Sequence, residues 1–327
     1  MAAFNLLALE PHKVSRDLTG YITYIYGEPK TGKTTLASKA GTALILAFER
    51  GYNALPGVYA QDIGTWGDVR AIMRELKKAE VKEKFQTIIF DTVDIAGSLC
   101  EKYICAQAGV DRIGDIPYGQ GWTMMKKEFE EIVRTIAGLG YAVFFISHEK
   151  DKLFKRKDGT EYNQTIPSCP NTFNEICKNL ADIYAYAEKY EDNGIPKVRL
   201  VIRSLDNAAD CGCRFKYIDP VIDMSYQALV DALNKAIDKE AEATNGQFVT
   251  NERNVQSVQK NLDYDALIKE FNELAGALME KDAAAYGPKI TYTVERYLGK
   301  GKKVSESTMA QVELLDLIVQ EIKDTLM

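Results

Sequence analysis

The sequence predicts an α/β fold with a mainly parallel central sheet, followed by a small helical module at the C-terminal end. Apolar, β-branched runs alternate with helical patterns through the first two thirds of the 327 residues, as in proteins with a parallel sheet. A glycine-rich loop joins the first apolar run to the first helical pattern. Beyond a polar, Asn- and Gln-rich stretch, apolar residues recur at helical spacing. The length also favours a second module, because single cores rarely exceed about 250–300 residues.

The predicted strands are near-continuous apolar runs, which parallel strands need when helices cover both faces of their sheet. They are expected at residues 21–26, 43–48, 86–91, 141–147, 183–187 and 197–202. Helical patterns separate or follow them, at residues 33–40, 66–79 behind Thr65 as a possible N-cap, 93–108, 122–137 and 226–239. Strand–helix repetition of this kind predicts an α/β domain with a mainly parallel sheet.

The domain organisation follows from a change in composition near residue 241. We expect a core over residues 1–240 and a polar linker over residues 241–261. Residues 262–327 form the helical module, with helices predicted at 264–283, 290–298 and 307–326.

Charge and composition exclude several classes of protein. A net charge of −6 argues against a protein that coats nucleic acid with its whole surface, although a local basic patch stays possible. No run approaches the ~18 apolar residues of a membrane span, and the N-terminal segment lacks the pattern of a signal peptide. We therefore expect a cytoplasmic protein with no membrane partner.

Six cysteines and two histidines bear on metal binding and redox state. No paired CxxC spacing occurs, so buried, reduced thiols are the favoured interpretation. The alternative is a metal site built from four cysteines, namely Cys169, Cys177, Cys211 and Cys213.

A complete GxxxxGK[ST] loop follows the first predicted strand and opens the first predicted helix. Its residues are Gly27, Glu28, Pro29, Lys30, Thr31, Gly32, Lys33 and Thr34, with Thr35 next in the chain. Such a loop curls so that backbone N–H groups point at phosphate oxygens, while the lysine reaches the β- and γ-phosphates. The hydroxyl of Thr34 is expected to ligate Mg²⁺. The loop predicts binding of ATP with Mg²⁺.

Polar residues at the ends of other predicted strands complete the candidate site. Asp91 ends a buried strand and is the predicted second Mg²⁺ ligand. Glu49 ends the second strand, where it could activate the attacking water, and Asp94 is the alternative base. His148 ends the fourth strand and could sense the γ-phosphate, although a lone histidine is often structural.

The arrangement of residues 27–34, Glu49, Asp91 and Ser147-His148 resembles the RecA/KaiC branch of P-loop ATPases. More narrowly, it is similar to phage-encoded RecA-like ATPases of the Sak type, which are often labelled AAA-domain or nucleotide-binding phage proteins. The resemblance covers about residues 18–238. The extra N-terminal oligomerisation domain of the bacterial recombinases is not expected in this sequence. The resemblance implies ATP-driven work on single-stranded DNA in phage recombination, annealing or replication, in the host cytoplasm.

A basic segment directly follows His148, and Asp158-Gly159 predicts a tight turn within it. The resulting hairpin could grip a DNA backbone and stack bases, or it could be a solvated surface hairpin. Its candidate DNA-binding residues are Lys150, Lys152, Phe154, Lys155, Arg156 and Lys157.

Assembly and partners follow from the same resemblance, which implies a homo-oligomeric ring or filament. Arg203 and Arg214 are candidates to complete a neighbour's site, with ordinary pairing to Asp206, Asp210 or Asp219 as the alternative. The C-terminal module could bind a single-strand-binding protein or mediate self-association. Its turn at 299–303 is either a second backbone contact or a solubilising turn.

Two other functions stay open from the sequence. A small-molecule P-loop kinase normally has an arginine-rich mobile lid, whereas residues 150–160 contain only one arginine. A non-catalytic scaffold switched by nucleotide would leave Glu49 without a role.

Overall fold

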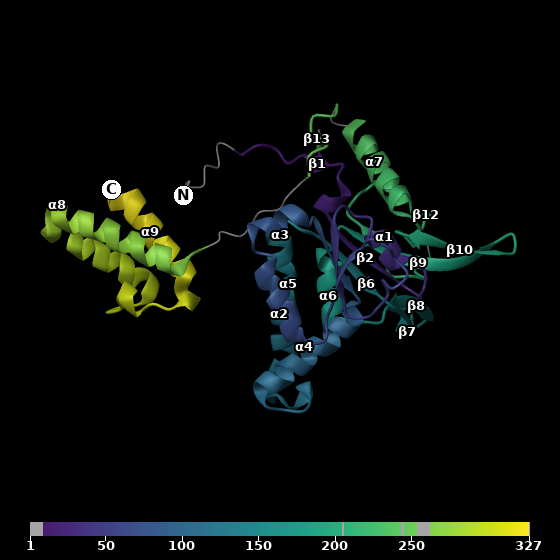
Figure 1. The fold of residues 1–327 in the computed structure, drawn as a ribbon, viewed down its shortest axis with the longest axis horizontal. Coiled ribbons are helices and arrows are strands. Elements are labelled where there is room, and N and C mark those ends of the chain that lie inside the picture. The colour runs from purple at the N-terminus through teal and green to yellow at the C-terminus, as the bar shows by residue number, and fades with distance from the viewer. Residues whose placement is uncertain (1–8, 205, 243–244, 254–261, 327) are drawn as a thin grey trace. The chain divides into compact units, whose positions relative to one another are not determined.

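The computed structural model describes residues 9–204, 206–242, 245–253 and 262–326. Contacts divide the chain into two compact units, Met1–Val258 and Gln259–Met327 (Figure 1). Each unit is built around its own apolar core, as expected of separate modules.

A nine-stranded sheet forms the centre of the first unit, in the order β12-β10-β9-β2-β6-β5-β3-β4 with β11 beside β9. The strands from β9 to β4 pair in parallel, and β10, β11 and β12 pair antiparallel at one side. The predicted mainly parallel sheet is therefore confirmed. The strands are β2 (Ile22–Gly27), β3 (Ala43–Ala47), β4 (Tyr59–Asp62), β5 (Thr87–Asp91), β6 (Ala142–Ser147), β9 (Ile183–Asp192), β10 (Ile195–Val201), β11 (Gly212–Cys213) and β12 (Val221–Asp223).

Helices cover both faces of this sheet, which explains why the central strands are apolar on both sides. Tyr24 points into the core under α2, α4, α5 and α6, whereas its neighbour Ile25 points into the core under α1 and α7. The helices are α1 (Lys33–Ala37), α2 (Trp66–Glu75), α3 (Ala79–Lys84), α4 (Val93–Ala108), α5 (Gln120–Gly138), α6 (Asn171–Leu180) and α7 (Tyr226–Glu242).

Two helices in the first part of the core are shorter than predicted. The first ends at Ala37 instead of residue 40, because the chain turns at Gly41 with φ of +62°. This left-handed backbone conformation is one that glycine adopts without steric cost. The helix predicted over 66–79 is divided into α2 and α3, and its N-cap at Thr65 is confirmed by a capping box with Asp68.

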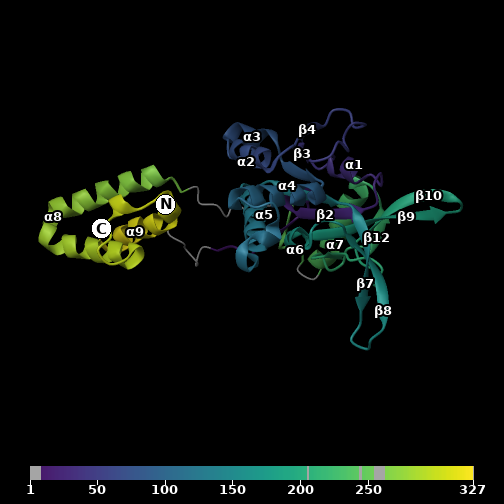
Figure 2. The same cartoon turned by 90° about the horizontal axis from the view of Figure 1, so that it is seen from below.

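The predicted basic hairpin is confirmed as a separate two-stranded antiparallel sheet of β7 (Glu149–Lys155) and β8 (Glu161–Pro167). It projects from the first unit next to the long β9–β10 hairpin (Figure 2). Gly159 adopts a φ of +89° in the connecting turn, which glycine adopts without steric cost.

The predicted linker is too long at its N-terminal side. Helix α7 continues to Glu242, and β13 (Val249–Thr250) pairs in parallel with β1 (Val14–Ser15). Arg253 then donates hydrogen bonds to the backbone carbonyls of Thr19 and Gln86, so the chain stays attached to the first unit as far as residue 253. Residues 243–244 and 254–261 of the predicted linker lie outside the described residues.

The second unit is helical, with α8 (Tyr264–Leu298) and α9 (Val312–Leu326) as its main elements. Asp282 has non-helical φ and ψ values and divides α8 into two parts that correspond to the first two predicted helices. The third begins at Val312 rather than residue 307, because two short 3-10 turns precede it. The core of the second unit contains Leu267, Leu278, Ile290, Val294, Val304, Leu315, Ile318, Val319 and Ile322.

Candidate functional site

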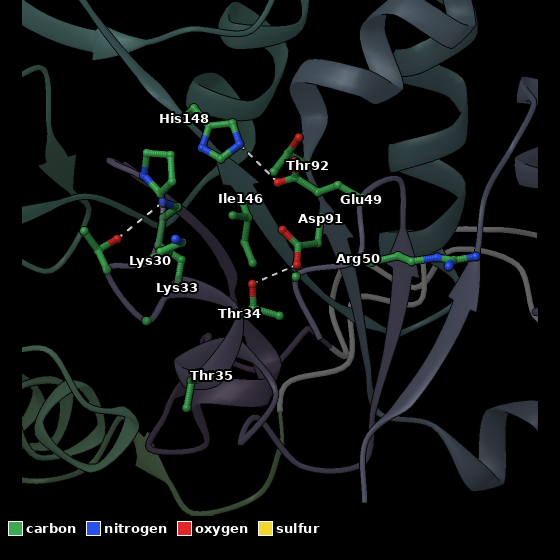
Figure 3. Close-up of a pocket in the computed structure, with 14 residues that line it drawn as sticks. Lys30, Lys33, Thr34, Thr35, Glu49, Arg50, Asp91, Thr92, Ile146 and His148 are labelled. Carbon is green, nitrogen blue, oxygen red and sulfur yellow. Dashed lines mark hydrogen bonds and ion pairs between the residues drawn. The ribbon is translucent and has the colours of Figure 1, made fainter. Parts of the chain in front are cut away.

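The phosphate loop lies between β2 and α1, as the sequence predicts, and borders a cavity of about 510 Å³ (Figure 3). Gly27 has a φ of +152°, and a Cβ there would lie 2.5 Å from the carbonyl oxygen of Ala187. Glycine is therefore required where the loop leaves the sheet. The predicted loop residues that line the cavity are Pro29, Lys30, Thr31, Gly32, Lys33, Thr34 and Thr35.

Lys33 is held inside the loop by backbone oxygens. Its Nζ donates to the carbonyl oxygens of Gly27 at 2.7 Å and Glu28 at 2.6 Å. These two residues therefore position the lysine rather than line the cavity, and the Glu28 side chain contacts Lys189 of β9. Burial lowers the pKa of Lys33 to about 8. A bound phosphate would favour its charged form.

Thr34 and Asp91 meet at the mouth of the loop, as predicted for a shared Mg²⁺ site. The Thr34 hydroxyl donates to Asp91 Oδ2 at 2.8 Å. Burial raises the pKa of Asp91 to about 6, and the hydrogen bond from Thr34 opposes that rise. Among the residues that the structure describes, no group of three or more His, Cys, Asp or Glu side chains could hold a metal. One hydroxyl and one carboxylate suit Mg²⁺, which keeps waters and takes phosphate oxygens as further ligands.

Two residues beside this pair were not identified from the sequence. Gly51 leaves space for an ion, since a Cβ there would lie 3.2 Å from Asp91 Oδ2 and 3.3 Å from Thr34 Oγ1. Thr92 lines the cavity, and its Oγ1 is buried without a hydrogen-bond partner in the described part of the chain. The sequence signal was weak: Thr92 directly follows a predicted strand, and Gly51 lies three residues beyond the end of another. Both features fit a site for a hydrated ion and phosphate.

Glu49 and His148 form a pair across the mouth of the cavity (Figure 3). Their Oε1 and Nε2 atoms are 3.1 Å apart, and about a third of each side chain is exposed. The hydrogen bond between them lowers the pKa of Glu49 and raises the pKa of His148. Strand β6 lies between β2 and β5, so His148 emerges between the phosphate loop and Asp91. Glu49, the predicted base, and His148, the predicted sensor, therefore contact each other directly.

Asp94, the alternative base, has a different place. Its Oδ2 accepts a hydrogen bond from the His148 backbone N–H at 3.2 Å, and its Oδ1 accepts one from the Ser168 hydroxyl. It is absent from the residues that line the cavity. Both oxygens are engaged outside the nucleotide site, so the structure favours Glu49 as the base.

One face of the β7–β8 hairpin combines aromatic rings with cations. Phe154 and Tyr162 stack across the strands with ring centroids 5.7 Å apart. The Lys152 ammonium lies 5.1 Å from the Phe154 ring centre, and the Arg156 guanidinium lies 4.6 Å from that of Tyr162. The remaining predicted DNA-binding residues, Lys150, Lys155 and Lys157, are exposed. Such a face could contact both phosphates and bases.

The two candidate arginines lie near the N-terminal end of β9, whereas the phosphate loop follows the C-terminal end of β2, which pairs in parallel with β9. Arg203 donates to the carbonyl oxygen of Phe215 at 2.8 Å. Arg214 pairs with Asp182 at 3.1 Å, rather than with the aspartates considered from the sequence. Both therefore support the fold of their own chain, and a role in a neighbour's site stays a prediction.

All six cysteines are free thiols, and four of them are buried. The cysteines of the alternative metal site form no such cluster, since no candidate metal group occurs within the described ranges. The search of those ranges also found no helix long and apolar enough to cross a membrane.

Comparison with known proteins gives two matches. A family described as "AAA domain" matches residues 19–210, more than half of the chain. The protein described as "SPbeta prophage-derived uncharacterized protein YorG" from Bacillus subtilis (strain 168) is 30% identical over 327 residues. That alignment covers 96% of each chain, so the similarity includes the C-terminal unit.

Proposed function

The chain belongs to the AAA-domain family, and from this premise we propose that it hydrolyses Mg²⁺-bound ATP to act on single-stranded DNA. Membership supports a nucleotide-binding P-loop ATPase, and the prophage-derived relative supports a phage protein. The resemblance to RecA-like ATPases of the Sak type implies recombination, annealing or replication of phage DNA, in the host cytoplasm.

Hydrolysis needs a positioned water, a base and a stabilised phosphoryl group. Lys33 and the loop N–H groups line the cavity where they would bind the β- and γ-phosphates, and Thr34 with Asp91 would hold Mg²⁺. The ion, when bound, neutralises charge on the phosphate oxygens. Glu49 accepts a proton from water as the water oxygen bonds to the γ-phosphorus. The bond from that phosphorus to the bridging oxygen breaks, leaving ADP and phosphate.

The contact between Glu49 and His148 is the observation that carries the proposal. A carboxylate that accepts a hydrogen bond from His148 is a weaker base, because the contact lowers its pKa. β7 begins at Glu149, directly after His148, so a displacement of the hairpin displaces the histidine. DNA binding would thereby release Glu49 for catalysis.

Single-stranded DNA is the proposed ligand of the hairpin. Stacked aromatic rings bind bases without strong sequence preference, and adjacent cations neutralise phosphates. Phe154, Tyr162, Lys152 and Arg156 supply this combination on one face. A solvated hairpin needs no such stack.

We further propose a homo-oligomer in which Arg203 or Arg214 of one copy stabilises charge at the site of the next. Self-association or contact with a single-strand-binding protein is the proposed role of the C-terminal unit. An ATP turnover rate per protomer that stays constant over a wide range of protein concentration would contradict the role in trans.

The test measures ATP turnover alone, with single-stranded DNA, and with candidate phosphate acceptors. The proposal predicts stimulation by DNA. Turnover that depends on an acceptor would instead indicate a kinase, and tight ATP binding with negligible turnover would indicate a scaffold.

A further inference from the structure

The base of the β7–β8 hairpin is fastened by one carboxylate. Asp94 accepts hydrogen bonds from the His148 N–H, just before β7, and from the Ser168 hydroxyl, just after β8. The Ser168 N–H also donates to the His148 carbonyl oxygen at 2.9 Å, which closes the hairpin at its base. A single side chain therefore contacts the chain where it enters the hairpin and where it leaves.

Asp94 also belongs to the element that follows the Mg²⁺ site. It lies in the first turn of α4, three residues after Asp91. The next turn of α4 packs closely on the chain beyond the hairpin, since a Cβ on Gly97 would lie 2.8 Å from Pro170 Cγ. The start of α4 and the base of the hairpin are thus held together by packing and by hydrogen bonds.

We propose that Asp94 is a positioning residue that couples nucleotide occupancy to the hairpin. A displacement of Asp91 on nucleotide binding would move the start of α4, because only two residues separate Asp91 from Asp94. Asp94 would then move both ends of the hairpin through its two hydrogen bonds. Coupling requires contacts that differ between two states, so the proposal requires these hydrogen bonds to differ between the nucleotide-free and the nucleotide-bound protein. The inference rests on the proposed function, because it presumes that the hairpin binds DNA.

The test compares Asp94→Ala with Asp111→Ala, which removes an exposed carboxylate just beyond the end of α4. Two ratios are measured: ATP turnover with and without an oligothymidine, and oligothymidine affinity with and without a non-hydrolysable ATP analogue. Coupling between sites is typically about 5- to 150-fold, and we expect Asp94→Ala to lower both ratios by more than twofold while His148 maintains part of the coupling. Turnover without DNA should stay near the wild-type value, because Asp94 does not line the cavity. Asp111→Ala should keep the wild-type ratios.

Ser168→Ala is the second variant, and it removes only one of the two donors to Asp94. If Asp94→Ala fails to fold, Ser168→Ala must still lower both ratios while leaving the melting temperature nearly unchanged. Wild-type ratios in the variant that folds would overturn the role of Asp94 and leave the proposed function intact. Ratios of one in the wild-type protein would overturn both the role of Asp94 and the proposed function.

Discussion

The nucleotide site and the β7–β8 hairpin stand next to each other but are built in opposite ways. The nucleotide site joins the ends of β2, β3, β5 and β6, and Lys33 and Asp91 within it are almost fully buried. The hairpin consists of two strands that pair with each other, and most of its side chains are exposed. Catalysis needs groups held in fixed positions, whereas an element that moves when it binds a ligand must be able to move independently of the sheet.

In the described part of the chain, hydrogen bonds join the nucleotide site to the hairpin near the base of the hairpin. Thr165 is held by the Tyr26 hydroxyl, and Asp94 holds both ends of the hairpin. Variants in the nucleotide site should therefore change catalysis directly, while hairpin variants should change it only through DNA.

The largest expected effect is that of Glu49→Gln, because it removes the base while keeping a group that can accept from His148. Turnover should fall by roughly 10²- to 10⁴-fold, the usual contribution of a general base. ATP affinity should be retained. Phosphate release and nucleotide binding are measured, with the exposed Glu80→Gln on α3 as control. Wild-type turnover in Glu49→Gln would show that the base lies elsewhere.

Lys33→Ala should have the second-largest effect on ATP turnover. Removing a preorganised charge that stabilises the transition state costs roughly 10²- to 10³-fold in turnover. Lys39, exposed just beyond α1, provides the matched control as Lys39→Ala. The rates of both variants should be compared at saturating ATP. An equal loss of turnover in Lys33→Ala and Lys39→Ala would show that the position of Lys33 in the phosphate loop is not what makes it important for catalysis.

Replacing Lys155, Arg156 and Lys157 with Glu should affect DNA alone. Each cation that contacts a phosphate contributes about 0.7 to the slope of log affinity against log salt for single strands. The slope should therefore fall by about 2 if all three contact phosphates, while turnover without DNA stays unchanged. Lys126→Glu with Lys127→Glu, on the exposed side of α5, is the control. An unchanged slope in the hairpin variant would remove the hairpin from DNA binding.

The smallest expected effect is a shift of the His148 titration. Its contact with Glu49 raises the pKa of His148 above the ordinary 6.5, so the proton is lost only as pH rises through that higher value. In Glu49→Gln the pKa should move back toward 6.5. Proton NMR can follow this, since His12 is the other histidine of the chain and serves as internal reference. An identical His148 titration in both proteins would refute an ion pair in solution.

Much of the nucleotide site could be predicted because its signal is local. The loop from Gly27 to Thr34 is contiguous, and Asp91 and Glu49 end apolar runs. Parallel strands bring their carboxyl ends to the same edge of a sheet, so these residues were expected to meet. The basic hairpin was predictable for the same reason, since Asp158-Gly159 marks its turn.

The contacts that join the two regions could not be predicted. Glu49 and His148 are 99 residues apart, and Asp94 and Ser168 are 74 apart. Whether they touch depends on the strand order and on how α4 leaves the sheet, which no short pattern encodes. The intrachain partners of Arg203 and Arg214 depend in the same way on the antiparallel side of the sheet.

The most direct test of the account is the affinity of the wild-type protein for a fluorescent oligothymidine, measured with and without Mg²⁺ and a non-hydrolysable ATP analogue. If nucleotide and DNA act on one Glu49–His148 contact, each must change the affinity of the other by the same factor. We expect the affinity for the oligothymidine to change at least about fivefold on adding the analogue. The same affinity in both conditions would contradict it, because the nucleotide site and the hairpin would then be independent.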